Sequence, residues 1–204
     1  MPLTRLPAQP PPDRARELWR VLRARQQLVD RYLLEEVIFP AVLGLPALRE
    51  VLFVGTAPYT RTYADRFRPV HLRTIDIDIE QAPYGSSDHI IGSVVEIDTH
   101  LPAASLDAVF LNGVFGFGLD DPGDADRALQ ALARCMRPGA TLVIGWNDHP
   151  LFRPFRPEDL PSLDRFERAP LAPFPFYRYP TFSPLGHVFD FYRSSGEPMP
   201  DAPV

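Results

Sequence analysis

The chain has 204 residues, of which 45% are apolar, and a formal net charge of −5 at pH 7. This length and apolar content suit a single domain with a substantial core, and the acidic balance predicts neither a nucleic-acid footprint nor a polybasic membrane patch. All 21 basic residues are arginine. The lack of lysine excludes a P-loop NTPase and a pyridoxal-phosphate enzyme, because both chemistries need a lysine side chain.

The cysteine count and the lengths of the apolar runs limit the class of protein further. Cys135 is the single cysteine, so neither an intramolecular disulfide nor a cysteine-based zinc cluster is possible, and a buried structural thiol is expected. No charged-then-apolar leader is present, and no apolar run approaches the roughly 18 residues of a membrane span. We therefore expect a soluble, cytoplasmic protein with no membrane partner; its oligomeric state is unknown from the sequence.

The N-terminal part reads as a lead-in followed by a helical unit. Residues 1–12 hold five prolines and are expected to be disordered. From Asp13, apolar residues recur at helical spacing as far as Ile38, and Pro40 is expected to stop the helix. This unit, residues 13–49, is expected either to pack on the edge of a sheet or to act as a lid over a substrate.

Short apolar runs bounded by turn signals predict five buried strands. The runs are 51–54, 72–77, 90–92, 107–112 and 141–146. Helical segments alternate with them, most clearly residues 125–136, which end at an Arg-Pro-Gly turn. The alternation predicts a doubly wound, mostly parallel α/β sheet with helices on both faces, whose core is residues 50–150.

The C-terminal segment, residues 151–193, has a different composition. Residues 169–184 hold five prolines and five aromatic residues, which suits neither a helix interior nor a central strand. This stretch is expected to wall an acceptor pocket or to cover the edge of the sheet. Residues 186–193 alternate as a last, antiparallel strand, and residues 194–204 are expected to fray. The whole of residues 13–193 thus forms one predicted domain.

One βαβ unit carries a nucleotide-binding pattern. Gly55 breaks the first strand, small residues follow it, and residues 60–66 can begin a helix whose free N–H groups face the turn. Asp76 ends the second strand, 21 residues after Gly55. Strand, small-residue turn, helix, strand and acid are typical of the nucleotide-binding half of a Rossmann-like fold, in which the carboxylate receives ribose hydroxyls.

Three stretches in this order resemble the class I S-adenosylmethionine-dependent methyltransferases, over about residues 45–193. They are VLFVG with the acid of TIDID (residues 74–78), SLDAVFLNGV (105–114) and ALQALARCMRPGATLVIGW (128–146). The resemblance implies a Rossmann-like fold and S-adenosylmethionine as cofactor, with S-adenosylhomocysteine as product. It also implies cofactor-binding roles: Gly55, Thr56 and Ala57 along the methionine part, Asp76 with Ile77 at the ribose, Ser93 and Val94 beside the adenine, and Asn112 and Gly113 near the sulfonium.

The chain departs from the family's usual pattern at several positions. Phe53 stands where an acid is usual, Ala57 and Tyr59 replace later glycines, and Ser93 stands where aspartate is frequent. These departures keep open a second hypothesis, a catalytically inactive methyltransferase-fold protein with a binding or regulatory role. A third hypothesis, a nicotinamide-dependent reductase, fits the first βαβ unit but not the Arg-Pro-Gly turn and closing strand.

Methyl transfer needs an acceptor held in line and, for a weak nucleophile, a base. Asp148 and His149 directly follow the fifth strand and are the predicted catalytic residues. His89, in a polar loop, also qualifies, whereas His187 lies inside the last strand and is expected to be a packed or edge residue.

No metal site is predicted. Asp120, Asp121, Asp124 and Asp126 lack the spacing of a cation-binding loop and read as the acidic start of a helix. Together these features predict methylation of an oxygen or nitrogen on a small-molecule acceptor, with no nucleic-acid partner.

Overall fold

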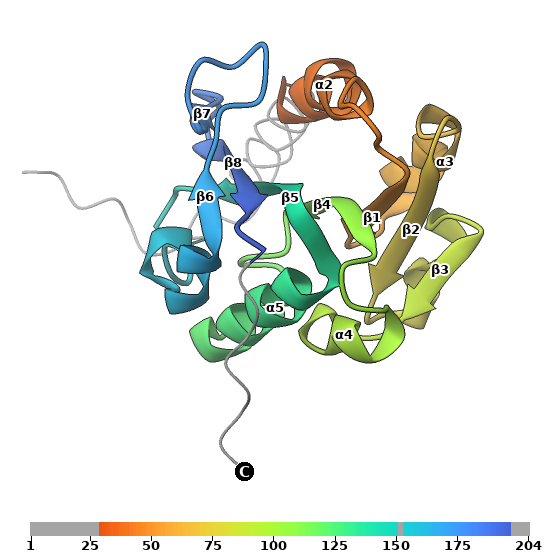
Figure 1. Ribbon diagram of the computed structural model, residues 1–204. Helices are drawn as coiled ribbons and strands as arrows, with labels where there is room; N and C mark the ends of the chain where they lie inside the picture. Colours follow the sequence, from red (N-terminus) through yellow and green to blue (C-terminus); the bar gives the residue numbers. More distant parts are fainter. Residues whose placement is uncertain (1–28, 151–152, 197–204) are drawn as a thin grey trace, which may run out of the picture.

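A computed structural model describes residues 29–150 and 153–196, and these form an α/β structure around one sheet (Figure 1). The strands are β1 (Glu50–Val54), β2 (His71–Asp76), β3 (Asp88–Ile91), β4 (Leu106–Asn112), β5 (Met136–Asn147), β6 (Phe166–Arg168), β7 (Arg178–Pro180) and β8 (His187–Ser194). Their order is β3-β2-β1-β4-β5-β8-β6, and β7 also pairs with β8. The predicted lead-in, the start of the N-terminal helix and the tail beyond 196 lie outside the described residues.

The predicted sheet is confirmed. β1 to β5 pair in parallel, and β8 runs antiparallel to β5, β6 and β7. The carboxyl ends of β1, β2, β4 and β5 therefore meet at one edge, and the antiparallel β8 begins at that same edge, with His187 in register with Asn147. β8 extends to Ser194, one residue beyond its predicted end, where Ser194 pairs with Phe166.

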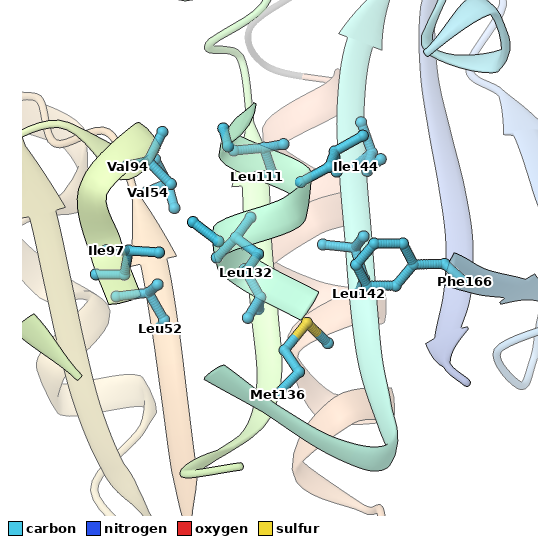
Figure 2. Packing of buried hydrophobic residues seen from close by; sticks show 14 of the residues in the cluster. Leu52, Val54, Val94, Ile97, Leu111, Leu132, Met136, Leu142, Ile144 and Phe166 are labelled. Carbon is cyan, nitrogen blue, oxygen red and sulfur yellow. The ribbon is translucent and has the colours of Figure 1, made fainter. Parts of the chain in front are cut away.

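Alternate residues of the central strands feed two cores. Leu52 and Val54 point to one face, which is covered by α5 (Pro122–Cys135), α4 (Ile97–His100) and the 3-10 turn η4 (Val94–Glu96). Figure 2 shows Leu132 of α5 at the centre of this cluster, among apolar side chains from β1, β4 and β5. Because both faces of the sheet are buried, the strands read as continuous apolar runs, which is why the sequence identified them.

The start of α5 explains the cluster of aspartates. The Asp121 carboxylate accepts the backbone N–H of Asp124 at 2.9 Å and caps the helix, with Pro122 in its first turn. Asp126 accepts the backbone N–H and the hydroxyl of Ser162, at 2.7 and 2.9 Å. These carboxylates therefore serve capping and packing roles, in line with the expected acidic helix start.

The opposite face is covered by the N-terminal helical unit and by α3 (Tyr63–Arg66), with the 3-10 turn η2 (Pro58–Thr62) leading into it. Helical residues 29–33 continue through η1 (Leu34–Ile38) into α2 (Phe39–Leu43). The prediction that Pro40 stops the helix is wrong. Residues 34–38 form a π-helical turn, in which the N–H of Phe39 bonds to the carbonyl of Leu34, and this wider turn accommodates a proline that an α-helical interior would exclude.

The C-terminal segment covers the sheet beyond β5. Two 3-10 turns, η5 (Pro157–Asp159) and η6 (Pro161–Arg165), precede β6. Leu171 and Phe174 of the Pro/aromatic stretch are buried in the same core as Phe53 and Phe110, so this stretch does cover the sheet. Within the described ranges, no helix has the length and apolar character needed to cross a membrane.

Candidate functional site

A cavity of about 350 Å³ opens along the edge where the parallel strands end. Its lining comes from the last residues of β2, β4 and β5, the loops after β1 and β4, η2, α3, the start of β8 with the residues just before it, and the N-terminal helix. The lining residues are Asp30, Arg31, Leu34, Gly55, Thr56, Tyr59, Tyr63, Asp76, Asn112, Gly113, Val114, Phe117, Asn147, Leu185, His187 and Phe189. From β2 to β8 the sheet advances by four strand spacings, about 19 Å at roughly 4.8 Å each. The cavity is thus long enough to have two ends of different chemistry.

The β2 end is built around the Asp76 carboxylate. Its Oδ2 accepts the backbone N–H of Thr56 at 2.6 Å, and its Oδ1 accepts the backbone N–H of Asp78 at 2.9 Å. Gly55 adopts φ +84°, and a Cβ there would lie 3.2 Å from Cγ1 of Val114, so the turn favours glycine. Asp76 therefore fixes the loop that follows β1 and also lines the cavity, and a carboxylate has acceptor capacity beyond these two bonds.

The small residues after Gly55 are held by a threonine on η2. Thr60 Oγ1 accepts the backbone N–H of Ala57 at 3.1 Å and lies 2.8 Å from the carbonyl oxygens of Ala57 and Tyr84. The turn η3 (Ile79–Tyr84) is thereby joined to the first loop. The Thr60–Tyr84 bond joins positions 24 apart in the sequence, and together with the Asp76–Thr56 bond it makes the β2 end a well-braced backbone cradle.

Phe53, at the position where the family usually has an acid, is 1% exposed. Its ring lies edge-on to that of Tyr63, with centroids 5.1 Å apart, and packs beside those of Phe39 and Phe110. The side chain is therefore part of the core below the cavity and offers no polar contact to a ligand.

The N-terminal helix forms one wall of the cavity. Asp30, on helical residues 29–33, is 8% exposed, and both Asp30 and Arg31 line the cavity. The Arg31 guanidinium lies 4.0 Å from the centre of the Tyr59 ring. Glu35 accepts the hydroxyl of Tyr63 at 3.0 Å and also pairs with Arg66, which ties the helix to α3. The helix is thus both packed on the sheet and part of the cavity wall.

The β8 end is built around His187, which is 7% exposed. Its Nδ1 lies 2.9 Å from the Asn147 amide oxygen. Because that oxygen can only accept, Nδ1 carries the proton and Nε2 is left with a lone pair. Burial lowers the pKa of His187 to about 4, so the imidazole is neutral at pH 7.

Two buried acceptor atoms at this end have no hydrogen-bond partner among the described residues: His187 Nε2 and Asn112 Oδ1. They flank Gly145, where a Cβ would overlap Asn112 Oδ1 and lie 3.1 Å from His187 Nε2. Gly113, with φ +68°, continues the turn after β4 and leaves this region open. The arrangement can hold a ligand group that donates hydrogen bonds.

The structure brings together some of the predicted site residues. Gly55, Thr56, Asp76, Asn112 and Gly113 line the cavity, whereas the lining does not include Ala57, Ile77, Ser93, Val94, Asp148 or His149. The Ser93 hydroxyl accepts the backbone N–H of Val95, and Val94 is buried in the core beside Val54 (Figure 2). Ile77 is 74% exposed beside Asp76.

The two predicted catalytic residues follow Asn147 directly. Asp148 forms an ion pair with Arg153, and its backbone N–H bonds to the Gly186 carbonyl at 2.8 Å. The carbonyl of His149 accepts the backbone N–H of Arg153 at 2.9 Å. Their catalytic role stays a prediction. Asn147 was not among the predicted site residues, and His187 was predicted as a packed or edge residue. The position of Asn147, immediately after the fifth apolar run, could have indicated a place at the cavity.

Comparison with known structures identifies the architecture. The chain is similar to the N-methyltransferase NodS from Bradyrhizobium japonicum, with a TM-score of 0.58, 15% identity and coverage of 89% of this chain and 98% of that one. An S-adenosylmethionine-dependent methyltransferase from Archaeoglobus fulgidus gives a TM-score of 0.57, 15% identity and coverage of 89% and 100%. The chain has the class I methyltransferase fold.

The fold also hosts another chemistry among these similar structures. The [4+2]-cyclase SpnF aligns with a TM-score of 0.56 at 14% identity, over 84% of this chain and 82% of that one. No family model and no curated protein sequence matches the chain. At such identities the likeness establishes the fold, and the function has to be argued from the site itself.

Proposed function

We propose that the protein transfers a methyl group from S-adenosylmethionine to an oxygen or nitrogen of a small-molecule acceptor. The observation that carries the proposal is one continuous cavity with a carboxylate at the β2 end and, at the β8 end, two buried hydrogen-bond acceptors that have no partner among the described residues. The bound cofactor supplies an activated methyl group, so the chain has only to bind, orient and deprotonate. Its volume of about 350 Å³ lies within the range of roughly 300–1,000 Å³ that is typical of small-molecule sites.

The residues of the β2 end fit the cofactor. Asp76 lines the cavity with acceptor capacity left for ribose hydroxyls, and Gly55 and Thr56 bring the backbone to the cavity wall. Asn112 and Gly113 extend the same wall toward the sulfonium position. Ala57 belongs to the braced loop at the methionine part, and Ile77, Ser93 and Val94 are proposed to lie around the adenine. At position 53 the buried Phe53 ring offers no polar group in place of the usual acid.

A small acceptor is supported by the cavity and by the similar structures. The helix that carries Asp30 and Leu34 walls the cavity, which limits the size of an acceptor. A similar structure, a 1,6-didemethyltoxoflavin N1-methyltransferase from Burkholderia thailandensis, holds a small molecule together with S-adenosylhomocysteine. We propose the same kind of acceptor here, with no nucleic-acid or membrane partner, and a cytoplasmic location.

The test is calorimetric titration of S-adenosylhomocysteine into the wild-type protein, Asp76→Ala and Asp76→Asn. Loss of hydrogen bonds to a carboxylate predicts binding weakened roughly 10- to 100-fold in Asp76→Ala. Asp76→Asn keeps an oxygen for the Thr56 N–H and is expected to be less affected. The matched control is Asp65→Ala, because Asp65 is an exposed aspartate that pairs with Arg68 outside the cavity. Equal affinity in all four proteins would remove Asp76 from the site.

The second candidate is a methyltransferase-fold protein that binds a ligand without transferring a methyl group. Phe53 favours it, because a buried ring replaces the acid expected near the methionine amino group. The cyclase SpnF illustrates that this fold supports other functions. Binding of S-adenosylhomocysteine together with methyl transfer from labelled S-adenosylmethionine favours the enzyme; binding without transfer to any compound of a small-molecule panel favours the alternative.

A further inference from the structure

Two buried acceptor atoms without a hydrogen-bond partner in the described ranges lie at the β8 end, and they determine which donors a methyl acceptor must offer. His187 Nε2 and Asn112 Oδ1 come from neighbouring parts of the sheet, the start of β8 and the end of β4, on either side of Gly145 of β5. Both atoms are buried and neither has a hydrogen-bond partner in the described ranges. Leaving two such atoms unsatisfied costs stability, which a ligand with two donors recovers on binding.

The tautomer of His187 determines whether the bound molecule must donate or accept a hydrogen bond at Nε2. Asn147 Oδ1 holds the proton on Nδ1, so Nε2 can only accept. Asn112 Oδ1 also only accepts. A hydroxyl group has one hydrogen and satisfies one of the two atoms, whereas a primary amino group has two hydrogens and satisfies both. An amino group held in this way keeps its nitrogen lone pair free for the methyl group.

The charge of the amino group at pH 7 restricts the class of amine further. An aliphatic amine resembles the lysine side chain, with a pKa of about 10.4, and is a cation without a lone pair at pH 7. An amino group on an aromatic ring is neutral at that pH. The surroundings suit a ring, since Tyr63, Phe117 and Phe189 line the cavity.

We propose that the methyl acceptor is a neutral primary arylamine, whose two N–H groups donate to His187 Nε2 and Asn112 Oδ1. This inference rests on the proposed methyl transfer. In the reaction the nitrogen lone pair forms the N–C bond, and the S–C bond breaks with its electrons going to sulfur. The methylated nitrogen then loses one proton, which passes to His187 Nε2 and on to solvent. His187 is thus a catalytic residue that binds the acceptor and receives its proton.

The test compares three aromatic probes that differ in the number of donors: aniline with two N–H donors, phenol with one O–H donor, and N,N-dimethylaniline with none. Each is titrated into protein with and without saturating S-adenosylhomocysteine, and the ¹⁵N signals of labelled histidine side chains are recorded. Aniline is expected to shift the Nε2 signal of His187 and to bind roughly tenfold more tightly than phenol, because phenol leaves one buried acceptor unpaired. N,N-dimethylaniline is expected to bind more weakly still.

Two variants sharpen the test. His187→Asn retains an amide N–H near the Nδ1 position for Asn147 but removes Nε2, and it is expected to weaken aniline binding roughly tenfold with unchanged affinity for S-adenosylhomocysteine. The matched control is His89→Asn. His89 likewise bonds through Nδ1, at 2.8 Å from Thr74 Oγ1, and has a buried Nε2 without a partner in the described ranges, but it lies on β3 and does not line the cavity.

The outcomes separate this inference from the proposed function. Equal binding of aniline and phenol, an unshifted Nε2 signal with aniline, or undiminished aniline binding in His187→Asn would each overturn the arylamine assignment. If His187→Asn does not fold, the comparison of the three probes on the wild-type protein decides alone. If S-adenosylhomocysteine does not bind, the proposed methyl transfer is contradicted instead. The titrations without it then test only whether the cavity binds an arylamine.

Discussion

The two ends of the cavity are built in different ways. At the β2 end, Asp76 accepts the backbone N–H of Thr56, and Thr60 bonds to the backbone of Ala57 and Tyr84. The Asp76–Thr56 and Thr60–Tyr84 bonds join positions 20 and 24 residues apart. At the β8 end, Asn147 and His187 bond to each other from positions 40 residues apart, and two buried acceptor atoms have no hydrogen-bond partner among the described residues. A braced backbone cradle suits a ligand of fixed shape, whereas buried acceptor atoms that lack a partner select a ligand by the hydrogen-bond donors it carries.

The β8 end is positioned by a buried polar network behind it. Asp190, fully buried on β8, accepts Trp146 Nε1 at 2.9 Å and both Nε and Nη2 of Arg178, at 2.7 and 2.8 Å. Arg178 also pairs with Glu158 at 3.0 Å, and this hydrogen bond lowers the pKa of Glu158. The network holds β7, β8 and β5 together. A substitution within it therefore tests most directly whether the β8 end depends on these contacts.

Asp190→Ala is expected to have the largest effect. It leaves the Trp146 N–H and part of the Arg178 guanidinium buried without an acceptor, and we expect a loss of about 3–5 kcal/mol in the free energy of unfolding. Denaturant unfolding measures this change. Glu167→Gln on the exposed side of β6 is the control and is expected to stay within about 0.5 kcal/mol of wild type. Similar stabilities for the two variants would contradict the role given to Asp190.

The second effect is the pH dependence contributed by His187. Its pKa is about 4 in the folded protein, against 6.5 for an unperturbed imidazole, so the unfolded chain binds more protons between these values. Stability therefore falls as the pH drops from about 6.5 to about 4, by about 3 kcal/mol at most, and is unaffected by this group above pH 7. The measurement is the difference in unfolding free energy between wild type and His187→Asn across this pH range. A difference that does not change with pH would contradict the assignment of a buried neutral imidazole.

The fold and the β2 end could be predicted because their signals are local. Apolar runs mark strands buried on both faces, and Gly55 and Asp76 mark a turn and a strand end within one βαβ unit. Pro40 misled the prediction, since the π-helical turn that accommodates it depends on packing of Leu34 and Ile38 against the sheet.

The β8 end could not be predicted in the same way. His187 gains its role from the antiparallel register that sets it beside Asn147, and register between distant strands is not visible in a single run of residues. Asn112 was predicted at the cavity from the resemblance, but the position of its buried Oδ1 depends on the absence of a side chain at Gly145. The sequence therefore predicted the catalytic pair at Asp148 and His149, the first titratable residues after the predicted strand.

A third prediction concerns Gly145. Gly145→Ala forces the Asn112 side chain to move, and we expect a loss of about 1–3 kcal/mol in stability together with weaker aniline binding. Gly44→Ala is the matched control, because a Cβ there meets Pro40 and Ala41 only at ordinary contact distances of 3.4 and 3.5 Å. Unchanged aniline binding in a folded Gly145→Ala protein would argue against Asn112 as an acceptor ligand.

The smallest effect on stability is expected for Asp148→Asn, since the exposed ion pair with Arg153 contributes at most about 1 kcal/mol. The same variant separates the two catalytic assignments. Initial rates of methyl transfer to aniline are expected to fall more in His187→Asn than in Asp148→Asn or His149→Gln. The reverse order would return the catalytic role to the residues that follow β5.

The most direct test of the central claim is thermal unfolding of the wild-type protein with S-adenosylmethionine, S-adenosylhomocysteine or NADH. A ligand at about 100 times its dissociation constant stabilises the folded state by roughly 2.7 kcal/mol, which is a readily measured increase in melting temperature. We expect this increase with both adenosyl compounds and none with NADH. No increase with either adenosyl compound at millimolar concentration, or an increase with NADH alone, would contradict the assignment of the cavity to S-adenosylmethionine.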